Sequence, residues 1–401
     1  MVNYLKICII GAGAVGSVVA RYLAAQSYVS EIKLCDKAFE KAKETACRIN
    51  SDKISVYQVD AYNIHELVQL SKGADVLFNA LEPSFNLNLL EAALQAGSNY
   101  QDMAFGPPYE NFVKMLRQSE KWTDAQLTAI TATGNSPGIT NIIAASAAEE
   151  LDYVEDIRIF VASSLDSKKY ILSWSPKTMI MDMIAEPTIF KNGQFTKVPP
   201  FSGQEIYEFP DPVGHVLVSY HEHEEPYTLG RASSLLNKGL RLVEFKYGLS
   251  LLIKNLYELG ILSRELIEIK GVKIAPLDVV LTVLPPPIAS DKLVHMIKTG
   301  DVYGSRGASV VKVTGEKAGK RVKLSYAYFY PNIIELQQKY PGATHVSYMA
   351  GISAALLTEF LGSGKIRTKG VLAPESLESD VRGKYLQKLA RQGIVVKKLL
   401  D

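Results

Sequence analysis

The chain has 401 residues, of which 47% are hydrophobic and 21% are charged, and its formal net charge is +2. These values are ordinary for a globular protein with more than one domain. They exclude a strongly basic nucleic-acid surface, and because no uninterrupted apolar run reaches about 18 residues, we expect no membrane span.

Residues 5–36 predict a strand, a glycine loop, a helix and a second strand. The apolar run 5–10 leads into a Gly-x-Gly-x-x-Gly motif, residues 18–25 resemble a helix, and residues 31–36 end in an acid. The glycines of such a unit permit a tight turn, the approach of a pyrophosphate and close helix packing. The motif therefore predicts a dinucleotide site, with a glycine-rich turn that binds nothing as the alternative. Its expected cofactor contacts are Gly11, Gly13, Ala14, Val15 and Gly16.

Asp36 ends the second predicted strand, twenty residues after Gly16. A carboxylate at this place accepts hydrogen bonds from a ribose 2′-OH and repels a 2′-phosphate, which favours NAD over NADP. The neighbouring Lys37 could serve a phosphate. NAD is therefore the expected cofactor, and NADP stays possible.

Strands and helices alternate as far as about residue 140. We expect strands over 55–60, 74–80, 99–103 and 126–133, and helices over 64–73 and 86–96, the latter ending at Gly97. This alternation predicts an α/β fold with a Rossmann-type, doubly wound parallel sheet, whose ligands bind beyond the carboxyl ends of the strands. Residues at the carboxyl ends of these strands are further expected cofactor contacts: Asp60, Ala61, Asn79, Ala80 and Leu81.

Around Asp152 the pattern changes to strands, turns and prolines. Segments 197–208 and 278–285 belong to this strand-like region, and residues 304–329 predict a hairpin. A long helix over 344–361 and a helical tail over 378–400 follow, and we expect this part to return to the first domain. The predicted domains are a Rossmann domain, 1–140 plus about 345–401, and an inserted α+β domain, about 141–344.

The segment 134–141, GNSPGITN, follows the last predicted strand of the first domain. Proline and glycine shape a rigid loop, and Thr140 is a possible cap for a helix starting at Asn141. Such a helix end favours an anionic substrate group. Pro137, Gly138, Thr140 and Asn141 are therefore expected substrate contacts, and an ordinary strand–helix turn is the alternative.

Acid–base and carboxylate-binding candidates come from both domains. Asp102 lies at the carboxyl end of a predicted strand and could accept the proton that amine oxidation releases, or it could be a helix cap or backbone anchor. Arg231 and Arg241 could grip a substrate carboxylate, or be surface charges.

Residues 220–225, YHEHEE, are unusual in holding two histidines and three acids. In a strand, His221 and His223 would share one face and Glu222 and Glu224 the other. A metal site is possible, but we favour a charged, solvent-facing loop between the domains and expect no metal. Glu224 is a second catalytic candidate, and it or Glu225 could hold a substrate ammonium group.

Three cysteines, Cys8, Cys35 and Cys47, lack metal-ligand spacing, and the first two lie inside predicted strands. An odd count in such places argues for a reducing compartment. The sequence runs directly into its first strand without a signal peptide, so we expect a cytoplasmic protein.

The chain resembles the saccharopine dehydrogenase family at residues 11–17, 59–61, 75–81, 100–104, 134–141, 173–200 and 348–375. The resemblance implies a cofactor domain interrupted by a substrate and dimerisation domain. It also implies NAD(P)-dependent hydride transfer at the C–N bond of an amino acid or amino-acid adduct, of saccharopine or lysine type, in a homodimer. The alternatives are a polyamine enzyme like carboxynorspermidine dehydrogenase and a non-catalytic dinucleotide-binding sensor or scaffold.

Overall fold

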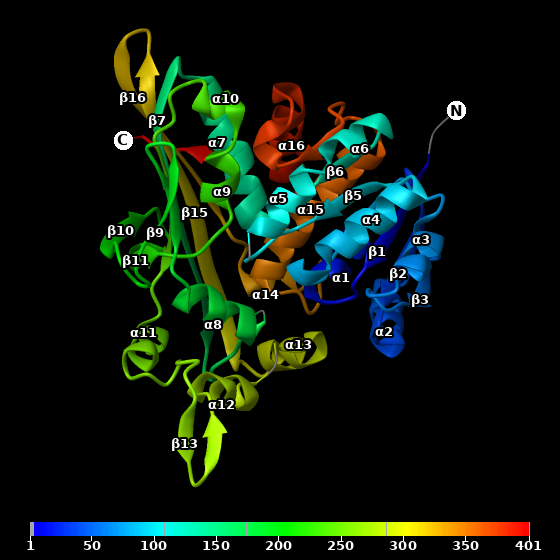
Figure 1. Cartoon of the computed structure of the whole chain (residues 1–401). Coiled ribbons are helices and arrows are strands. Elements are labelled where there is room, and N and C mark those ends of the chain that lie inside the picture. Colours follow the sequence, from blue (N-terminus) through cyan, green and yellow to red (C-terminus); the bar gives the residue numbers. More distant parts are fainter. Residues whose placement is uncertain (1–3, 108, 174, 286, 401) are drawn as a thin grey trace.

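A seven-stranded parallel sheet is the centre of the first domain, in the order β17-β6-β5-β4-β1-β2-β3 (Figure 1). The computed structural model describes residues 4–107, 109–173, 175–285 and 287–400. Buried apolar residues dominate the central strands, as expected where helices cover both faces of a sheet. The strands are β1 (Leu5–Ile10), β2 (Val29–Asp36), β3 (Ile54–Gln58), β4 (Val76–Asn79), β5 (Asn99–Asp102), β6 (Thr128–Ile130) and β17 (Gly370–Leu372).

Helices join and cover these strands. The Gly97 cap of α4 has a left-handed φ of 73°, as the sequence predicts. The helices are α1 (Ala14–Ala24), α2 (Phe39–Ile49), α3 (Ile64–Ser71), α4 (Asn86–Ala96), α5 (Glu110–Leu116), α6 (Ser119–Asp124), α7 (Thr140–Glu149), α15 (His345–Gly362) and α16 (Ser379–Arg391), with short 3₁₀ turns at Pro83–Phe85 and Pro374–Ser376.

A mixed sheet forms the second half, with its main path in the order β10-β11-β12-β7-β15-β16-β18. The predicted hairpin is confirmed, because β15 and β16 pair antiparallel from Ala308–Phe329 to Lys317–Lys320. The strands are β7 (Tyr153–Ser167), β8 (Thr188–Lys191), β9 (Gln194–Lys197), β10 (Glu205–Phe209), β11 (Gly214–Tyr220), β12 (Leu242–Gly248), β15 (Val302–Lys317), β16 (Lys320–Phe329) and β18 (Lys397–Lys398).

Shorter elements surround the mixed sheet, and a separate two-stranded ribbon, β13 (Ile267–Ile269) and β14 (Val272–Ile274), projects at the bottom of the view in Figure 1. The strand-like prediction for residues 278–285 is wrong, since most of this segment is in helix α12. Pro276 in the first turn of that helix and Asp278 close behind it favour a helix start over a strand. The remaining helices are α8 (Pro176–Ile184), α9 (Glu225–Leu229), α10 (Ser233–Leu236), α11 (Leu251–Glu258), α12 (Pro276–Val283), α13 (Ser290–Lys298) and α14 (Ile333–Leu336).

One apolar core joins the two sheets. It runs from Ile7 and Phe78 of the parallel sheet through α1, α7 and α15 to Ile159 and Phe245 of the mixed sheet. The segment after α15 adds β17 to the parallel sheet and then β18 to the mixed sheet. The predicted helical tail is therefore only partly helical, because it ends at Arg391 and the next strand follows. Among the described residues, none of the helices has the length and apolarity that a membrane crossing needs.

Candidate active site

The glycine loop lies at the carboxyl end of β1, beside the place where the strand order changes direction between β2 and β4. Gly11 has a φ of 108°, and a Cβ on Gly16 would lie 1.9 Å from the Gly11 carbonyl oxygen. A side chain at Gly16 would therefore break the contact between helix and loop. A Cβ on Gly13 would meet only the Lys41 amine at 3.9 Å, so this glycine borders open space at the start of α1. This is the room that a pyrophosphate needs at a helix N-terminus.

Asp36 supports the same loop from the end of β2. Its carboxylate accepts hydrogen bonds from the backbone N–H of Ala12 at 2.9 Å and of Ala38 at 2.9 Å. Lys37 turns away to form an exposed ion pair with Asp60 at 3.2 Å. The acid is therefore held at the loop, while the neighbouring cation already has a carboxylate partner.

The predicted contacts after β4 shape the loop by packing. The Asn79 amide is buried and donates to Asn86 and to Tyr100, and its oxygen accepts the Leu81 N–H at 2.9 Å. A Cβ on Gly11 would lie 2.9 Å from the Ala80 carbonyl oxygen. Asn79 thus fixes the turn that borders the glycine loop.

A cavity of about 250 Å³ lies between the two halves of the molecule. Val15 of α1, Gly134 and Asn135 of the loop after β6, and His221 and His223 all line it. Its other lining residues come from the loops after β5, β6 and β16, from α8, the mixed sheet and α15: Met103, Ala104, Ser136, Val161, Met179, Asp182, Met183, Phe245, Tyr247, Tyr330, Val346 and Ala350.

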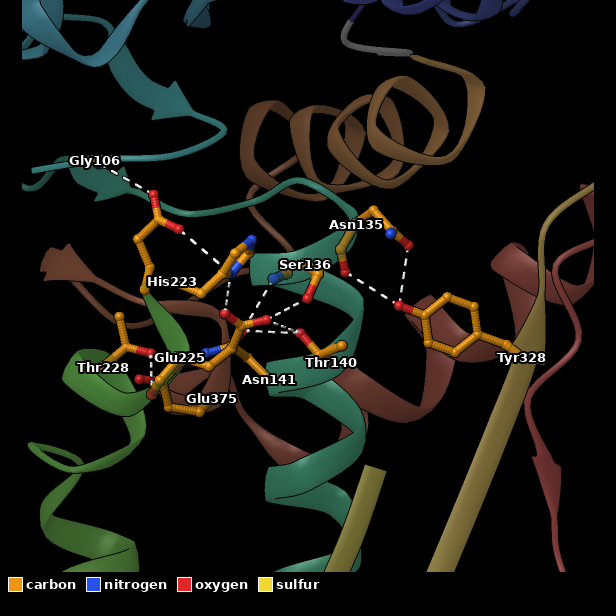
Figure 2. Close-up of polar contacts among 12 residues, drawn as sticks. Gly106, Asn135, Ser136, Thr140, Asn141, His223, Glu225, Thr228, Tyr328 and Glu375 are labelled. Atoms are coloured by element: carbon orange, nitrogen blue, oxygen red, sulfur yellow. Dashed lines mark hydrogen bonds and ion pairs between the residues drawn. The ribbon is translucent and has the colours of Figure 1, made fainter. Parts of the chain in front are cut away.

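The GNSPGITN loop holds an acid of the protein itself. Ser136 and Thr140 both donate hydrogen bonds to the buried carboxylate of Glu225 (Figure 2). The Thr140 hydroxyl is not a helix cap: α7 starts at Thr140, with Ile139 at the cap position. This hydroxyl donates its hydrogen bond to Glu225 instead, at 2.8 Å.

Three other residues of this loop segment are buried against the rest of the protein. Asn141 is buried and donates to Thr228 at 2.8 Å and to Glu375 at 3.0 Å (Figure 2). Gly138 has a φ of 131°, and a Cβ there would lie 2.9 Å from the Thr133 carbonyl carbon. Pro137 is buried beside it.

The solvent-facing interpretation of residues 220–225 is wrong. Glu222, Glu224 and Glu225 are buried, and the segment lies at the wall of the cavity. The predicted alternation does appear in the contacts: the histidines line the cavity, while Glu222 accepts the Thr188 N–H and Glu224 accepts the Gly106 N–H. The segment is polar throughout, so its sequence pattern does not show that another part of the protein covers it.

His223 and Glu225 form the central pair of this wall (Figure 2). The Nδ1 of His223 lies 2.5 Å from a Glu225 oxygen, and its ring stacks on Phe245 with 4.0 Å between ring centroids. Burial lowers the pKa of His223, but the carboxylates of Glu225 and Glu224 outweigh it and raise that pKa to about 9. Burial raises the pKa of Glu225, yet the histidine and the hydroxyls lower it overall. The pair is therefore an imidazolium–carboxylate ion pair at neutral pH.

Further acids surround this pair. Burial raises the pKa of Asp182 to about 7, and burial also raises the pKa of Glu224. Ligand atoms of His223, Glu224 and Glu225 lie within 4.8 Å of one another, a spacing compatible with a metal ion. The hydrogen bond between His223 and Glu225 already satisfies two of these atoms.

Asp102 is not among the residues that line the cavity, although the next residue, Met103, is. It is buried and accepts hydrogen bonds from the Thr131 hydroxyl at 2.6 Å, the Ala132 N–H at 3.0 Å and the Tyr100 hydroxyl at 3.0 Å. Burial raises its pKa to about 7. These contacts match the anchor alternative that its sequence position left open.

The two predicted arginines are also separate from this cavity. Arg231 lies over the ring of Phe195 at 4.2 Å and donates to the Tyr227 carbonyl, and Arg241 is exposed at the start of β12. Sequence reasoning missed Asp182, Tyr247 and Tyr330. Asp182 lies within the 173–200 segment, but nothing in its helical pattern distinguishes it from a solvent-facing acid; Trp174 of this segment lies outside the described residues.

A parallel sheet with a glycine loop at its switch point, and a cavity with titratable side chains between that loop and a second domain, defines a dinucleotide-dependent oxidoreductase. Two family models match this chain: the saccharopine dehydrogenase NADP binding domain at residues 7–130 and the saccharopine dehydrogenase C-terminal domain at residues 134–394. The chain belongs to the saccharopine dehydrogenase family. It is an NAD(P)-dependent oxidoreductase that acts on C–N bonds, as the sequence resemblance predicts.

Two curated relatives match along almost their whole length. Carboxyaminopropylagmatine dehydrogenase of Synechocystis is 26% identical, over 97% of this chain and 96% of the relative. Carboxynorspermidine synthase of Vibrio alginolyticus is 26% identical, over 92% of each chain.

Two solved structures share the fold. Saccharopine dehydrogenase (L-Glu forming) of Saccharomyces cerevisiae has a TM-score of 0.71 at 15% identity, covering 99% of this chain and 100% of that one. Homospermidine synthase of Legionella pneumophila, in complex with NAD, has a TM-score of 0.68 at 15% identity, covering 100% and 93%. These likenesses confirm the α/β architecture.

Proposed function

We propose that this enzyme forms, or oxidises, the secondary C–N bond of a carboxylated polyamine. The observation that carries the proposal is the group of carboxylates in and behind the wall of the cavity next to the glycine loop. Asp182 lines it, Glu224 and Glu225 lie directly behind His223, and its described lining includes neither lysine nor arginine. Such a site suits a substrate with several ammonium groups.

The two curated relatives support this choice over a lysine-type substrate. The names of both describe amines that carry a carboxylate and several nitrogens, and both relatives align over nearly the whole chain. In chemical terms, such a product results when an amine condenses with an amino-acid aldehyde, water leaves, and hydride adds to the iminium carbon.

The residues of the glycine loop would hold the cofactor, and a bound nicotinamide would supply the hydride. We assign proton transfer to His223, because its ring lines the cavity and Glu225 fixes its orientation. The imidazolium would donate a proton to the departing hydroxyl of the carbinolamine. Glu224 would adjust the charge of this histidine without contacting the substrate, and Asp102 would anchor β5 to β6.

The test is a panel of turnover assays, in which absorbance of the reduced cofactor measures the rate and mass spectrometry identifies the product. Amines are 1,3-diaminopropane, putrescine and agmatine, each with L-aspartate β-semialdehyde and NADH or NADPH; lysine and saccharopine are tested with the oxidised cofactors. We expect turnover with an amine–aldehyde pair and a product heavier than the amine by the carboxy-aminopropyl group. Turnover restricted to lysine or saccharopine would contradict the proposal.

A further inference from the structure

A second, larger cavity of about 820 Å³ adjoins the one beside the glycine loop. The two cavities share Met179, Met183 and Tyr247 as lining residues. The larger one extends along the ends of β7 and β12 and the segment that follows β7. The two cavities are therefore neighbours on either side of Tyr247, close enough for the two ends of one extended molecule.

The two cavities differ in charge. Lys168, Lys169 and Arg306 line the larger cavity, and its described lining includes no carboxylate. The smaller cavity has the opposite composition, with Asp182 and no lysine or arginine in its described lining. Arg306 has one contact with Asp166 at 3.3 Å and remains half exposed, so its guanidinium retains free donors for a ligand.

A buried histidine in the larger cavity has an unused ring nitrogen. His345 is 1% exposed, and its Nε2 lies 2.8 Å from the Ser163 hydroxyl, a second lining residue. Its Nδ1 has no hydrogen-bond partner among the described residues. A buried polar atom without a partner is costly, and a ligand that bonds to it would remove this cost. When the Ser163 hydroxyl donates to Nε2, the neutral ring carries its proton on Nδ1 and can donate it.

We propose that the larger cavity binds the carboxylate of the amino-acid half of the substrate, with Arg306 and the Nδ1–H of His345 as its partners. The polyamine half then lies in the smaller cavity near Asp182, and the reacting C–N bond lies at the junction by Tyr247. This assignment rests on the proposed function for its substrate class. It gives the enzyme a physical means to select a carboxylated partner over a plain amine or aldehyde.

The test is a binding titration that does not depend on turnover. L-2-aminobutyrate and propylamine differ by the carboxylate alone, and each is titrated by ligand-observed NMR into the full-length protein saturated with NAD. We expect aminobutyrate to bind at least tenfold more tightly than propylamine. Arg306→Met should remove this preference, and His345→Phe should reduce it several-fold.

Arg321→Met is the matched control, since Arg321 is an exposed arginine of β16 paired with Glu155 outside the cavity. Asp182→Asn should weaken the binding of 1,3-diaminopropane and leave the affinity for aminobutyrate unchanged. Equal binding of the two probes to the wild type, or an unchanged preference in Arg306→Met, would overturn the assignment. If the preference depends on Arg306 while no polyamine pair is turned over, the carboxylate subsite stands and the proposed polyamine function fails.

Discussion

Asp36 is placed to decide between the two nicotinamide dinucleotides. Its carboxylate is fixed at the glycine loop by two backbone N–H groups, and the adjacent Lys37 is paired with Asp60. We predict that the wild type binds NAD several-fold more tightly than NADP, because the acid repels a 2′-phosphate. Asp36→Ser should reverse or abolish this preference in fluorescence titrations. Equal wild-type affinities would mean that Lys37 leaves Asp60 to meet the phosphate, and Lys37→Ala should then weaken NADP selectively.

His223 gives the protein a pH dependence with a definite sign. Its folded-state pKa of about 9 lies above the ordinary value of 6.5, so the folded state binds its proton more tightly than the unfolded chain does. The resulting stability is fully present below pH 6.5 and is lost as the pH rises through about 9. We predict that the free energy of unfolding of His223→Gln, measured in urea, falls less over this interval than that of the wild type.

The same histidine should determine the alkaline limit of reductive turnover. We expect turnover of His223→Gln to fall by a factor on the order of 10², the lower end of what a positioned acid contributes. The fall in turnover that the wild type shows above about pH 9 should be absent in this variant. Cofactor affinity, measured separately, should change little. A variant that keeps both the rate and the alkaline decline would make His223 a structural partner of Glu225.

Asp102 should behave as an anchor. Asp102→Asn keeps an oxygen for Thr131 and Ala132, which both donate to Oδ1, but places an amide N–H opposite the Tyr100 hydroxyl, which donates to Oδ2. We predict a loss of about 1–3 kcal/mol of unfolding free energy in urea, because the buried Tyr100 hydroxyl loses its acceptor. Turnover of the folded variant should stay within a few-fold of the wild type. A large loss of turnover at unchanged stability would return Asp102 to the catalytic role that its place after β5 suggests.

Among the elements, the glycine loop permits a matched pair of substitutions. A Cβ at Gly13 meets open space, whereas one at Gly16 would overlap the Gly11 carbonyl. We predict that Gly13→Val folds normally and loses dinucleotide binding, since the side chain fills the pyrophosphate space. Gly16→Val should instead lower the melting temperature strongly. Circular dichroism and cofactor titration distinguish the two, and full cofactor binding by Gly13→Val would refute the assignment of the loop.

The elements that sequence predicts well are those with a local cause. The alternating first half, the Gly97 cap and the β15–β16 hairpin each follow from periodicity or turn residues, and all are present. The secondary structure of residues 278–285 is harder to predict, because a short apolar run has no period that separates strand from helix. Pro276, in the first turn of α12, is the residue that indicates a helix.

The candidate site was predictable only in its cofactor half. The glycine loop and Asp36 belong to one strand–helix–strand unit, residues 5–36, whereas the cavity combines α8, the segment after β11 and the loop after β6. Whether His223 faces solvent or Phe245 depends on how the two sheets pack, which no local pattern reports. The role of Glu225 as the partner of both Thr140 and His223 is a long-range contact of the same kind.

At the scale of the whole molecule, residues after 365 contribute to both sheets. Tyr385 and Leu389 of α16 are fully buried, whereas Lys397 and Lys398 of β18 are exposed. We predict that a protein lacking residues 366–401 fails to fold and to bind cofactor. A protein lacking only 397–401 should lose about 1 kcal/mol or less, since it loses a two-residue exposed strand. Circular dichroism and size-exclusion chromatography of both proteins check this, and a folded, cofactor-binding 1–365 fragment would contradict it.

The late position of β17 in the sequence has a consequence for biosynthesis. The edge of β6 that β17 covers is formed from residues synthesised some 240 positions earlier (370 against 130). During translation this edge and the apolar faces that α15 covers stay open until most of the polypeptide has left the ribosome. An exposed strand edge invites pairing with other chains. We therefore expect the nascent protein to need chaperone protection during most of its synthesis, and synonymous codon changes that slow translation between residues 150 and 340 to lower its soluble yield.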